Sequence, residues 1–370
     1  PRFLRWHTIS VAAWRQTIMG LAQRQRVAFT AAIFIGVALC AASPVMRVVE
    51  EHTSTNNHQL TVLCTTLEDW CHAMSEAFQR RTGIRTSYVR LAAGEALARL
   101  RATRDNPEYS VWWGSPADTL IAAGLEGLLE AYRSPNAAAI PPAYKDPEGW
   151  WTGVFVSTLG FCANTEVLSR LGLEQPDSWN DLLDHRLRGE VAMAHPASSG
   201  VAYTALWTQV ARLGSVDAAF AYLHALHRNI LQYTRSGPAP GLMAGRGEIA
   251  VAMIFAHDCL KFAEEGMPAL AVSFPREGTG YAVGGVALIK GAPERDAAKQ
   301  WIDWALTPEA QEIGPLVKAY PLPTHPRAKR PAQAVQLGTV KLVDYDLWEA
   351  GRQRRELSRR FEDEVSIAPQ

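Results

Sequence analysis

Short apolar runs alternate with stretches of helical periodicity along the first part of the chain. The run at 59–64 (QLTVLC) is rich in apolar and β-branched side chains, and it is followed by a stretch in which Ala73, Ala77 and Phe78 share one helical face. Small residues separate each run from the helix after it. Three such strand–loop–helix units in succession predict a parallel sheet with covering helices, with strands at 59–64, 84–91 and 110–113.

The same pattern returns further along, where strands are expected at 190–194, 230–233 and 248–255. Two longer extended stretches, 153–163 (GVFVSTLGFCA) and 281–289 (YAVGGVALI), lead out of the first set and back to it. Two α/β lobes joined by two extended crossovers form a hinge around a cleft. We therefore predict a two-lobed α/β fold, with lobe 1 at 59–155 and 282–370 and lobe 2 at 156–281.

The N-terminal segment predicts export. Residues 27–42 (VAFTAAIFIGVALCAA) are uncharged and follow Arg24 and Arg26, and the run is shorter than the roughly 20 residues of a spanning helix. We interpret 1–42 as a signal peptide or N-terminal anchor, with lipid attachment through Cys40 as a further alternative, and 43–58 as a polar spacer. Each alternative places the body of the protein outside the cytoplasm, in the periplasm.

Composition and charge narrow the class of protein. Hydrophobic residues make up 48% and charged residues 20% of the 370, which is typical of a globular protein and excludes a disordered one. The 37 basic and 37 acidic side chains cancel, but residues 1–42 carry five arginines and no acid. The rest of the chain is acidic on balance, so we expect no nucleic acid partner.

The cysteines leave two alternatives open. Four of them, Cys64, Cys71, Cys162 and Cys259, lie beyond the N-terminal segment, and an oxidising compartment permits disulfides between them. Cys64 and Cys71 are close enough in sequence to join a strand end to the next helix. Four partly buried thiols are the alternative. The chain has no Cys-x-x-Cys, so a redox motif or structural zinc has no support.

Small polar residues follow the predicted strands, where the next helix begins. Ligands of open α/β sheets bind beyond the carboxyl ends of the strands, and free N–H groups at helix N-termini attract anions. Such residues are also ordinary helix caps, so each one alone is weak evidence. Five of them at corresponding positions predict a cleft that binds an anion: Thr65–Thr66, Ala93–Gly94, Gly114–Ser115, Ser198–Gly200 and Ser236–Gly237.

Several segments carry a resemblance to a known family. They are SVWWGS at 110–115, HPASSGVAY at 195–203, RSGPAP at 235–240, GRGE at 245–248 and AKQWIDWALTPEAQ at 298–311. The chain resembles the bacterial extracellular solute-binding proteins of ABC importers, in the ferric-iron-binding-protein-like branch that includes hexose-phosphate, phosphoglycerate and phosphonate receptors. The resemblance implies the class II periplasmic-binding fold.

One departure from the ferric-binding members bears on the ligand. Those members present two adjacent tyrosines in the second lobe, whereas this chain has no Tyr-Tyr and carries Phe255-Ala-His257-Asp258-Cys259 near that place. The resemblance implies that His257 and Asp258 bind ligand hydroxyls, as the corresponding pair does in sugar-phosphate-binding relatives; a carboxylate and an imidazole suit a polyol. Alternatively, His257 closes a strand and Asp258 caps a helix.

Two sets of residues are expected to bind two different parts of the ligand. An anionic head, phosphate or phosphonate, is expected at Thr65, Thr66, Ser115, Ser198, Ser199 and the Gly200 N–H. His257 and Asp258, with Glu95 as a further candidate, are expected at the polar remainder. Arg90 and Arg235 lie near strand ends and suit a phosphate, while Trp112, Trp113, Trp150 and Trp151 are candidates for stacking or for the core. We expect no metal and no cofactor.

These observations predict the substrate-binding component of an ABC importer. We expect it to be a monomer, to capture a small anionic solute, with a sugar phosphate favoured, by hinge closure, and to deliver it to a permease in the inner membrane. The alternatives are a ferric-iron-binding component and a membrane-anchored component that presents its ligand to a phosphoglycerate-type sensor. We expect no enzymatic activity, because no nucleophile–base pair is evident.

Overall fold

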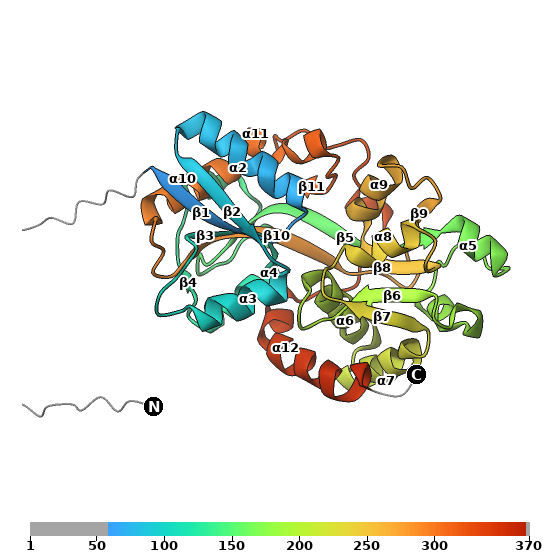
Figure 1. Cartoon of the computed structure of the whole chain (residues 1–370). Helices are drawn as coiled ribbons and strands as arrows, with labels where there is room; N and C mark the ends of the chain where they lie inside the picture. Colours follow the sequence, from blue (N-terminus) through green and yellow to red (C-terminus); the bar gives the residue numbers. More distant parts are fainter. Residues whose placement is uncertain (1–57, 368–370) are drawn as a thin grey trace, which may run out of the picture. The chain divides into compact units, whose positions relative to one another are not determined.

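The computed structural model describes residues 58–367, and Figure 1 shows two groups of strands and helices within them. The predicted signal or anchor segment at 1–42 and nearly all of the spacer at 43–58 lie outside the described residues. Within 58–367, no helix combines the length and the apolar character that crossing a bilayer requires. The predicted two-lobed α/β class is confirmed by the architecture described below.

The first lobe is built on a mixed sheet in the strand order β2-β1-β3-β10-β5. Strands β1, β2 and β3 are parallel, while β10 runs antiparallel to β3 and β5. Its elements are β1 (Gln59–Cys64), α2 (Glu68–Thr82), β2 (Arg85–Arg90), α3 (Ala93–Ala102), β3 (Val111–Pro116), α4 (Ala117–Leu125), β4 (Leu129–Glu130), β10 (Tyr281–Ile289), α10 (Arg295–Ala305), α11 (Pro308–Gln311), η5 (Gly314–Val317) and β11 (Leu322–Pro323).

Apolar side chains cover both faces of this sheet. On one face, α2 presents Trp70, Met74 and Phe78 at a spacing of four residues, and Trp301 of α10 meets Phe78 edge to face. Helices α3 and α4 cover the opposite face, as Figure 1 also shows. Trp112, Trp113 and Trp151 are almost fully buried in these two layers, so they serve the core.

The second lobe has the strand order β5-β8-β6-β7, with β6 parallel to both β7 and β8. Helices α8 and α9 cover one face of its sheet, and α6 and α7 cover the other. Its elements are α5 (Thr165–Arg170), β6 (Val191–Ala194), α6 (Gly200–Leu213), α7 (Val216–His227), β7 (Ile230–Thr234), α8 (Ala239–Gly245), β8 (Val251–Phe255), α9 (Ala256–Glu264) and β9 (Leu270–Ser273).

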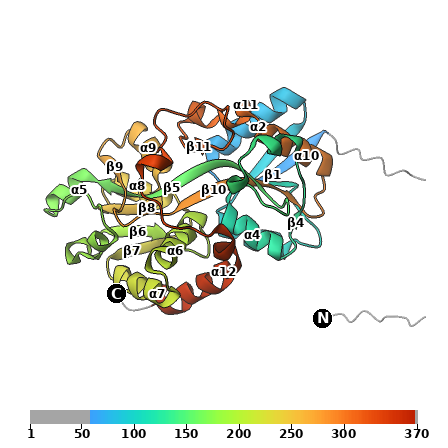
Figure 2. The same ribbon diagram turned by 180° about the vertical axis from the view of Figure 1, so that it is seen from behind.

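Strand β5 (Thr152–Asn164) belongs to both sheets. Its first half pairs with β10 up to Thr158, and from Leu159 onward it pairs with β8. All thirteen of its residues are buried, which explains the continuous apolar run in the sequence. The predicted crossovers, 153–163 and 281–289, correspond to β5 and β10, and Figure 2 shows both strands running between the lobes.

Two disulfides join neighbouring elements, so the alternative that the sequence left open is decided. Cys64 at the end of β1 is bonded to Cys71 in α2, and Cys162 in β5 is bonded to Cys259 in α9. The second bond closes a loop of 97 residues in the sequence. Such a bond stabilises the fold mainly by restricting the unfolded chain.

Strand β3 is longer than the sequence indicates. The pattern predicts that Gly114-Ser115-Pro116 ends the strand, but β3 continues through Pro116. The reason is its antiparallel partner, because Gly284 and Gly285 of β10 pair with Pro116 and Ser115. A partner from elsewhere in the chain is not visible in the local sequence.

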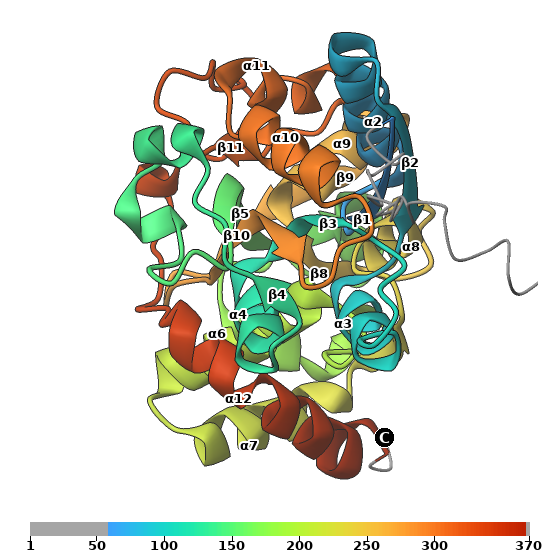
Figure 3. The ribbon, with the colours of Figure 1, turned by 90° about the vertical axis from the view of Figure 1, so that its left-hand side faces the viewer.

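The C-terminal helix α12 (Leu347–Arg360) contacts both lobes, and it continues into a π-helical turn, η7 (Phe361–Ser366). Figure 3 shows α12 alongside α4 and α7. Phe361 and Val365 pack into the second lobe's core, whereas the sequence assigns 282–370 to lobe 1. The exact division between the lobes remains a prediction.

A buried ion pair anchors α12. Arg354 donates to Asp118 of α4 at 3.0 Å, with both side chains almost fully buried. The guanidinium also lies 4.4 Å from the ring centroid of Tyr203 in α6, and the Tyr203 hydroxyl donates to the Ala350 carbonyl. Burial raises the pKa of Asp118, and the Arg354 charge opposes this rise. The outer face of α12, with Arg352, Arg355 and Arg359, is exposed, whereas Arg354 is buried.

We expect Arg354→Ala to lower the free energy of unfolding by about 3–5 kcal/mol, because it leaves the buried Asp118 carboxylate without its charged partner. Urea denaturation of the variant measures this loss. The control is Arg352→Ala on the exposed face of α12, for which we expect about 1 kcal/mol or less. Equal losses in the two variants would contradict the role given to the buried pair.

Candidate functional site

A cavity lies between the two lobes, at the carboxyl ends of the parallel strands. The first lobe contributes the residues after β1 and β2 and the end of β3, and the second lobe contributes the N-termini of α6, α8 and α9. The empty space between these residues is about 650 Å³, part of which is continuous with solvent. Ligands of open α/β sheets bind at such strand ends.

Most of the predicted binding residues line this cavity. The first lobe brings Thr65, Thr66 and Arg90 to it, from the ends of β1 and β2. The second lobe brings Ser199 and Gly200 at the start of α6, and His257 and Asp258 at the start of α9. Residues that are far apart in the sequence thus meet in one hollow, as the strand-end argument predicted.

Four predicted residues do not line the cavity. Ser115 is fully buried within β3, and its hydroxyl has no hydrogen-bond partner among the described residues. Ser198 donates to the His195 and Arg235 carbonyls. Glu95 accepts from Arg235 at 2.9 Å, and this pair bridges the lobes outside the cavity. The side chains of Ser198, Glu95 and Arg235 are thus hydrogen-bonded to other parts of the protein, outside the cavity.

The N-terminus of α6 carries the features of an anion site. Its cap residue Ser199 makes no side-chain capping bond, and the backbone N–H groups of Gly200 and Val201, which line the cavity, have no hydrogen-bond acceptor among residues 58–367. The helix is fourteen residues long, so its dipole adds to the attraction. A negatively charged group would satisfy these donors.

Arg90 supplies the positive charge of the cavity. Its Nε donates to the Thr66 carbonyl at 3.0 Å, and one terminal nitrogen lies 3.4 Å from the Ser236 hydroxyl of the second lobe. These contacts hold the guanidinium at the cavity wall and leave further N–H donors for a ligand.

His257 and Asp258 form the polar pair of the second lobe. Nε2 of His257 lies 3.4 Å from Oδ1 of Asp258, and the ring stacks on Phe255 with centroids 5.8 Å apart. The Nδ1 atom has no partner among the described residues. Burial lowers the pKa of His257 and raises that of Asp258; each residue opposes the shift of the other, and Arg90 also favours the charged carboxylate. The imidazole can donate or accept a hydrogen bond, and a carboxylate accepts from hydroxyls.

Three aromatic side chains in the cavity wall escaped the sequence reasoning. Trp70, Phe155 and Phe255 line the cavity, and the centroids of Trp70 and Phe155 lie 4.9 Å apart. Phe155 lies in the crossover strand β5, and Phe255 directly precedes the His257–Asp258 pair. These positions are the features of the sequence that could have identified the two phenylalanines as cavity residues. They give the cavity an apolar wall.

The lobes touch directly at the edge of the cavity. The Gly94 N–H donates to the Ser198 carbonyl across the cleft at 2.8 Å. A Cβ at Gly94 would lie 1.9 Å from the Ala197 carbonyl oxygen, and one at Gly200 would lie 2.6 Å from Pro116. Glycine at both positions is thus required for this close approach, which describes a closed cleft.

Comparison with known proteins assigns the family. Residues 123–349, more than half of the chain, match the family described as bacterial extracellular solute-binding protein. An uncharacterized protein of Haemophilus influenzae is 36% identical, with 84% of this chain and 91% of that protein covered. The chain belongs to the bacterial extracellular solute-binding proteins. It is a periplasmic solute-binding component of ABC import, and not an enzyme.

Related solute-binding proteins share both sequence and fold. A putative 2-aminoethylphosphonate-binding periplasmic protein of Salmonella typhimurium is 28% identical over 65% of this chain and 70% of its own length. The periplasmic binding protein AfuA of Actinobacillus pleuropneumoniae, solved with exogenous fructose 6-phosphate bound, is 40% identical with a TM-score of 0.81, covering 84% of this chain and 99% of AfuA. A ferric binding protein of Campylobacter jejuni shares the fold at 20% identity and a TM-score of 0.70, covering 82% and 98%.

Substitution of Gly94 tests whether, with a solute bound, the lobes approach as closely as the 2.8 Å hydrogen bond between Gly94 and Ser198 requires. We expect Gly94→Ala to weaken solute binding at least tenfold, because the new methyl group meets a backbone oxygen, and to leave the free energy of unfolding unchanged or higher. Calorimetric titration and urea denaturation measure the two effects. The control is Gly338→Ala, where a Cβ meets no atom within 4 Å. Unchanged affinity in Gly94→Ala would contradict closure to this distance.

The titration of His257 tests which of two opposing effects dominates its pKa: burial, which lowers it, or the Asp258 charge, which raises it. We expect the ring to titrate with a pKa below its ordinary value of 6.5, because burial outweighs the neighbouring carboxylate. The Cε1–H chemical shift, followed by NMR from pH 4 to pH 8, measures the midpoint. His257→Gln identifies the resonance. A midpoint above 6.5 would mean that the carboxylate dominates.

Proposed function

We propose that this solute-binding protein captures a sugar phosphate, with fructose 6-phosphate as the representative, and delivers it to an ABC permease. The observation that carries the proposal is the pairing of two different chemistries in one cavity. The α6 N-terminus and Arg90 suit an anion, and the buried His257–Asp258 pair suits hydroxyl groups. A sugar phosphate carries both kinds of group in one small molecule.

The phosphate would bind at the α6 N-terminus. Its oxygens would accept from the Gly200 and Val201 N–H groups, with the Ser199, Thr65 and Thr66 hydroxyls at the same cavity wall. Arg90 would approach from the first lobe and neutralise part of the charge. Because these groups come from both lobes, binding of the phosphate would favour the closed cleft.

The sugar would lie against His257 and Asp258. Strands β6 and β8 are neighbours in the sheet, so the segments that follow them reach the same cavity, where one small molecule can contact both. A carboxylate accepts from two hydroxyls, and an imidazole can donate or accept one more hydrogen bond. Phe155 and Phe255 would pack against the C–H groups of the sugar.

Two observations weigh against ferric iron as the cargo. Phe255 and His257 stand near the place where ferric-binding members carry paired tyrosines. In the part of the chain that the structure describes, no group of three or more His, Cys, Asp or Glu side chains is arranged to hold a metal ion. A hard trivalent cation requires a set of anionic oxygen ligands, whereas Asp258 is the one carboxylate among the described residues that line this cavity.

A thermal-shift screen of the protein tests the class of solute. Fructose 6-phosphate at about one hundred times its Kd should stabilise the protein by about 2.7 kcal/mol. 2-Aminoethylphosphonate, 3-phosphoglycerate, fructose and ferric citrate are the competing solutes. Stabilisation by 2-aminoethylphosphonate or ferric citrate alone would overturn the proposal.

Two variants test the division of the site. We expect Asp258→Asn to weaken fructose 6-phosphate at least tenfold, because hydrogen bonds to a charged group contribute about 1.5–3 kcal/mol, while inorganic phosphate binds as well or better. We expect Arg90→Met to weaken both ligands by similar factors. Calorimetric titration of each variant with each ligand measures the four changes. Equal loss of both ligands in Asp258→Asn would mean that Asp258 only supports the helix.

A further inference from the structure

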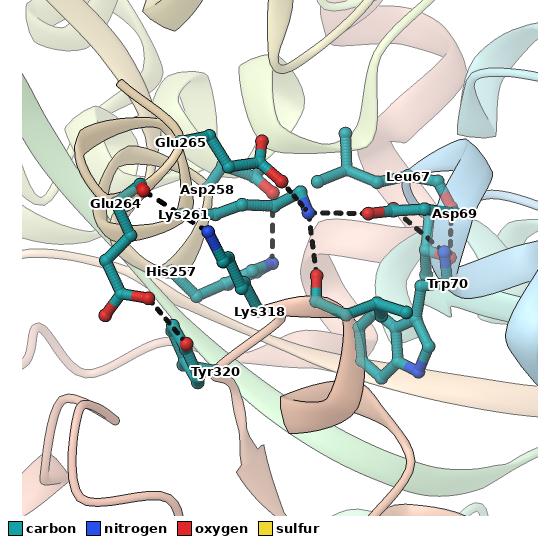
Figure 4. Close-up of polar contacts among 12 residues, drawn as sticks. Leu67, Asp69, Trp70, His257, Asp258, Lys261, Glu264, Glu265, Lys318 and Tyr320 are labelled. Carbon is teal, nitrogen blue, oxygen red and sulfur yellow. Dashed lines mark hydrogen bonds and ion pairs between the residues drawn. The ribbon is translucent and has the colours of Figure 1, made fainter. Parts of the chain in front are cut away.

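A lysine near the cavity holds the two lobes together. Lys261 lies in α9 of the second lobe and its side chain is only 5% exposed. Its ammonium group donates to three oxygens: Oδ2 of Asp69 at 2.5 Å, the Val317 carbonyl at 2.7 Å and Oε1 of Glu265 at 2.8 Å. Figure 4 shows the ammonium among these acceptors. All three hydrogens of the ammonium therefore have acceptors.

Two of the three acceptors belong to the other lobe. Asp69 lies in the first turn of α2, and Val317 ends η5, whereas Glu265 directly follows α9 itself. Opening the cleft would separate Lys261 from Asp69 and Val317 and leave only the Glu265 contact. Nothing within the second lobe replaces the lost acceptors among the described contacts, so opening costs a buried ammonium two of its hydrogen bonds.

The surrounding charges make Lys261 essential to this junction. On the second-lobe side stand Asp258, Glu264 and Glu265, and on the first-lobe side stands Asp69, so carboxylates face one another across the cleft. Burial lowers the pKa of Lys261, but the hydrogen bonds that its ammonium donates to Asp69 and Glu265 more than offset this and raise it, which keeps the ammonium charged. Without that charge, like charges would repel the lobes from each other.

Two neighbouring contacts reinforce the same junction. Lys318 donates to the Glu264 carbonyl at 3.2 Å, and the Tyr320 hydroxyl donates to the Glu264 carboxylate at 2.7 Å. Both join the segment after η5 to α9. Lys318 is half-buried, whereas Lys261 is buried. Lys261 does not line the cavity, so it has no contact with a solute bound there.

We propose that Lys261 is a closure latch, which sets how tightly and how long a solute is held by stabilising the closed lobes without touching the solute. A solute that binds the closed form gains affinity in proportion to the population of that form. The latch concerns the lobes and not the chemistry of the cargo. It therefore stands apart from the sugar-phosphate proposal.

Three variants give the latch a distinctive signature. Lys261→Met keeps the apolar stem but removes the charge, and Asp69→Asn removes the facing carboxylate. Each alone should favour the open form. In the double variant, Asp69→Asn should instead restore closure relative to Lys261→Met, because it removes a repulsion there. This reversal of sign distinguishes a charge latch from a loss of packing.

The readout is amide hydrogen exchange of Gly94, whose N–H bonds to Ser198 across the cleft and belongs to neither the latch nor the cavity wall. Measured by NMR on the full chain without added solute, exchange should be at least fivefold faster in Lys261→Met and in Asp69→Asn. The double variant should exchange more slowly than Lys261→Met. Lys145→Met is the control, because among the described residues the ammonium of Lys145 donates to Ala137 of its own lobe and to nothing in the other lobe.

Fructose 6-phosphate serves as the solute probe in a second measurement. Its Kd and its dissociation rate should each rise at least fivefold in Lys261→Met and stay within twofold of the wild type in Lys145→Met. If the wild type does not bind fructose 6-phosphate, the sugar-phosphate proposal fails, but the exchange test still decides on the latch. Equal Gly94 exchange in all proteins, or additive effects in the double variant, would overturn the latch. Asp69 is partly exposed, so Asp69→Asn keeps the test open should Lys261→Met fail to fold.

Discussion

Backbone pairing along β5 is the constraint on which the rest of the structure depends. One buried strand of thirteen residues pairs with β10 in the first sheet and with β8 in the second, so the two sheets share a strand and cannot separate. This arrangement turns the carboxyl ends of both sets of parallel strands toward one hollow. The helix N-termini that follow those strands then supply the N–H groups and hydroxyls of the site. The cavity is a consequence of the shared strand.

Closure of the cleft buries several charged side chains. Burying a charge without a partner costs free energy, and the arrangement of these side chains follows from that cost. Asp258, His257 and Arg90 are placed at the cavity wall, and Lys261 with Asp69 lies just outside it. A buried carboxylate or ammonium is tolerated only with partners, and here several partners come from the opposite lobe. The closed form therefore satisfies groups that the open form would leave incomplete. Binding and closure are linked through the same charges.

Local patterns predicted much of the fold and part of the site. The apolar runs located β1, β5 and β10 correctly, because strand periodicity and turn residues are local properties. Thr65, Ser199 and Asp258, which the strand-end rule predicted for the site, lie at one cavity. Ser115 lies outside its wall because β10 extends β3 past it, and Glu95 because Arg235 meets it from the other lobe. Both placements depend on partners more than a hundred residues away.

The sequence by itself determined the alternation of strands and helices, the chemistry at the strand ends and the family resemblance, since each depends on neighbouring residues. Only the tertiary structure decided which cysteines are bonded, that Arg354 is buried against Asp118 and that Lys261 joins the two lobes. In the sequence, Arg354 and Lys261 look like ordinary surface charges of amphipathic helices. Their roles depend on acceptors that the fold brings from distant segments, and hydrogen bonds and ion pairs act only over a few ångströms.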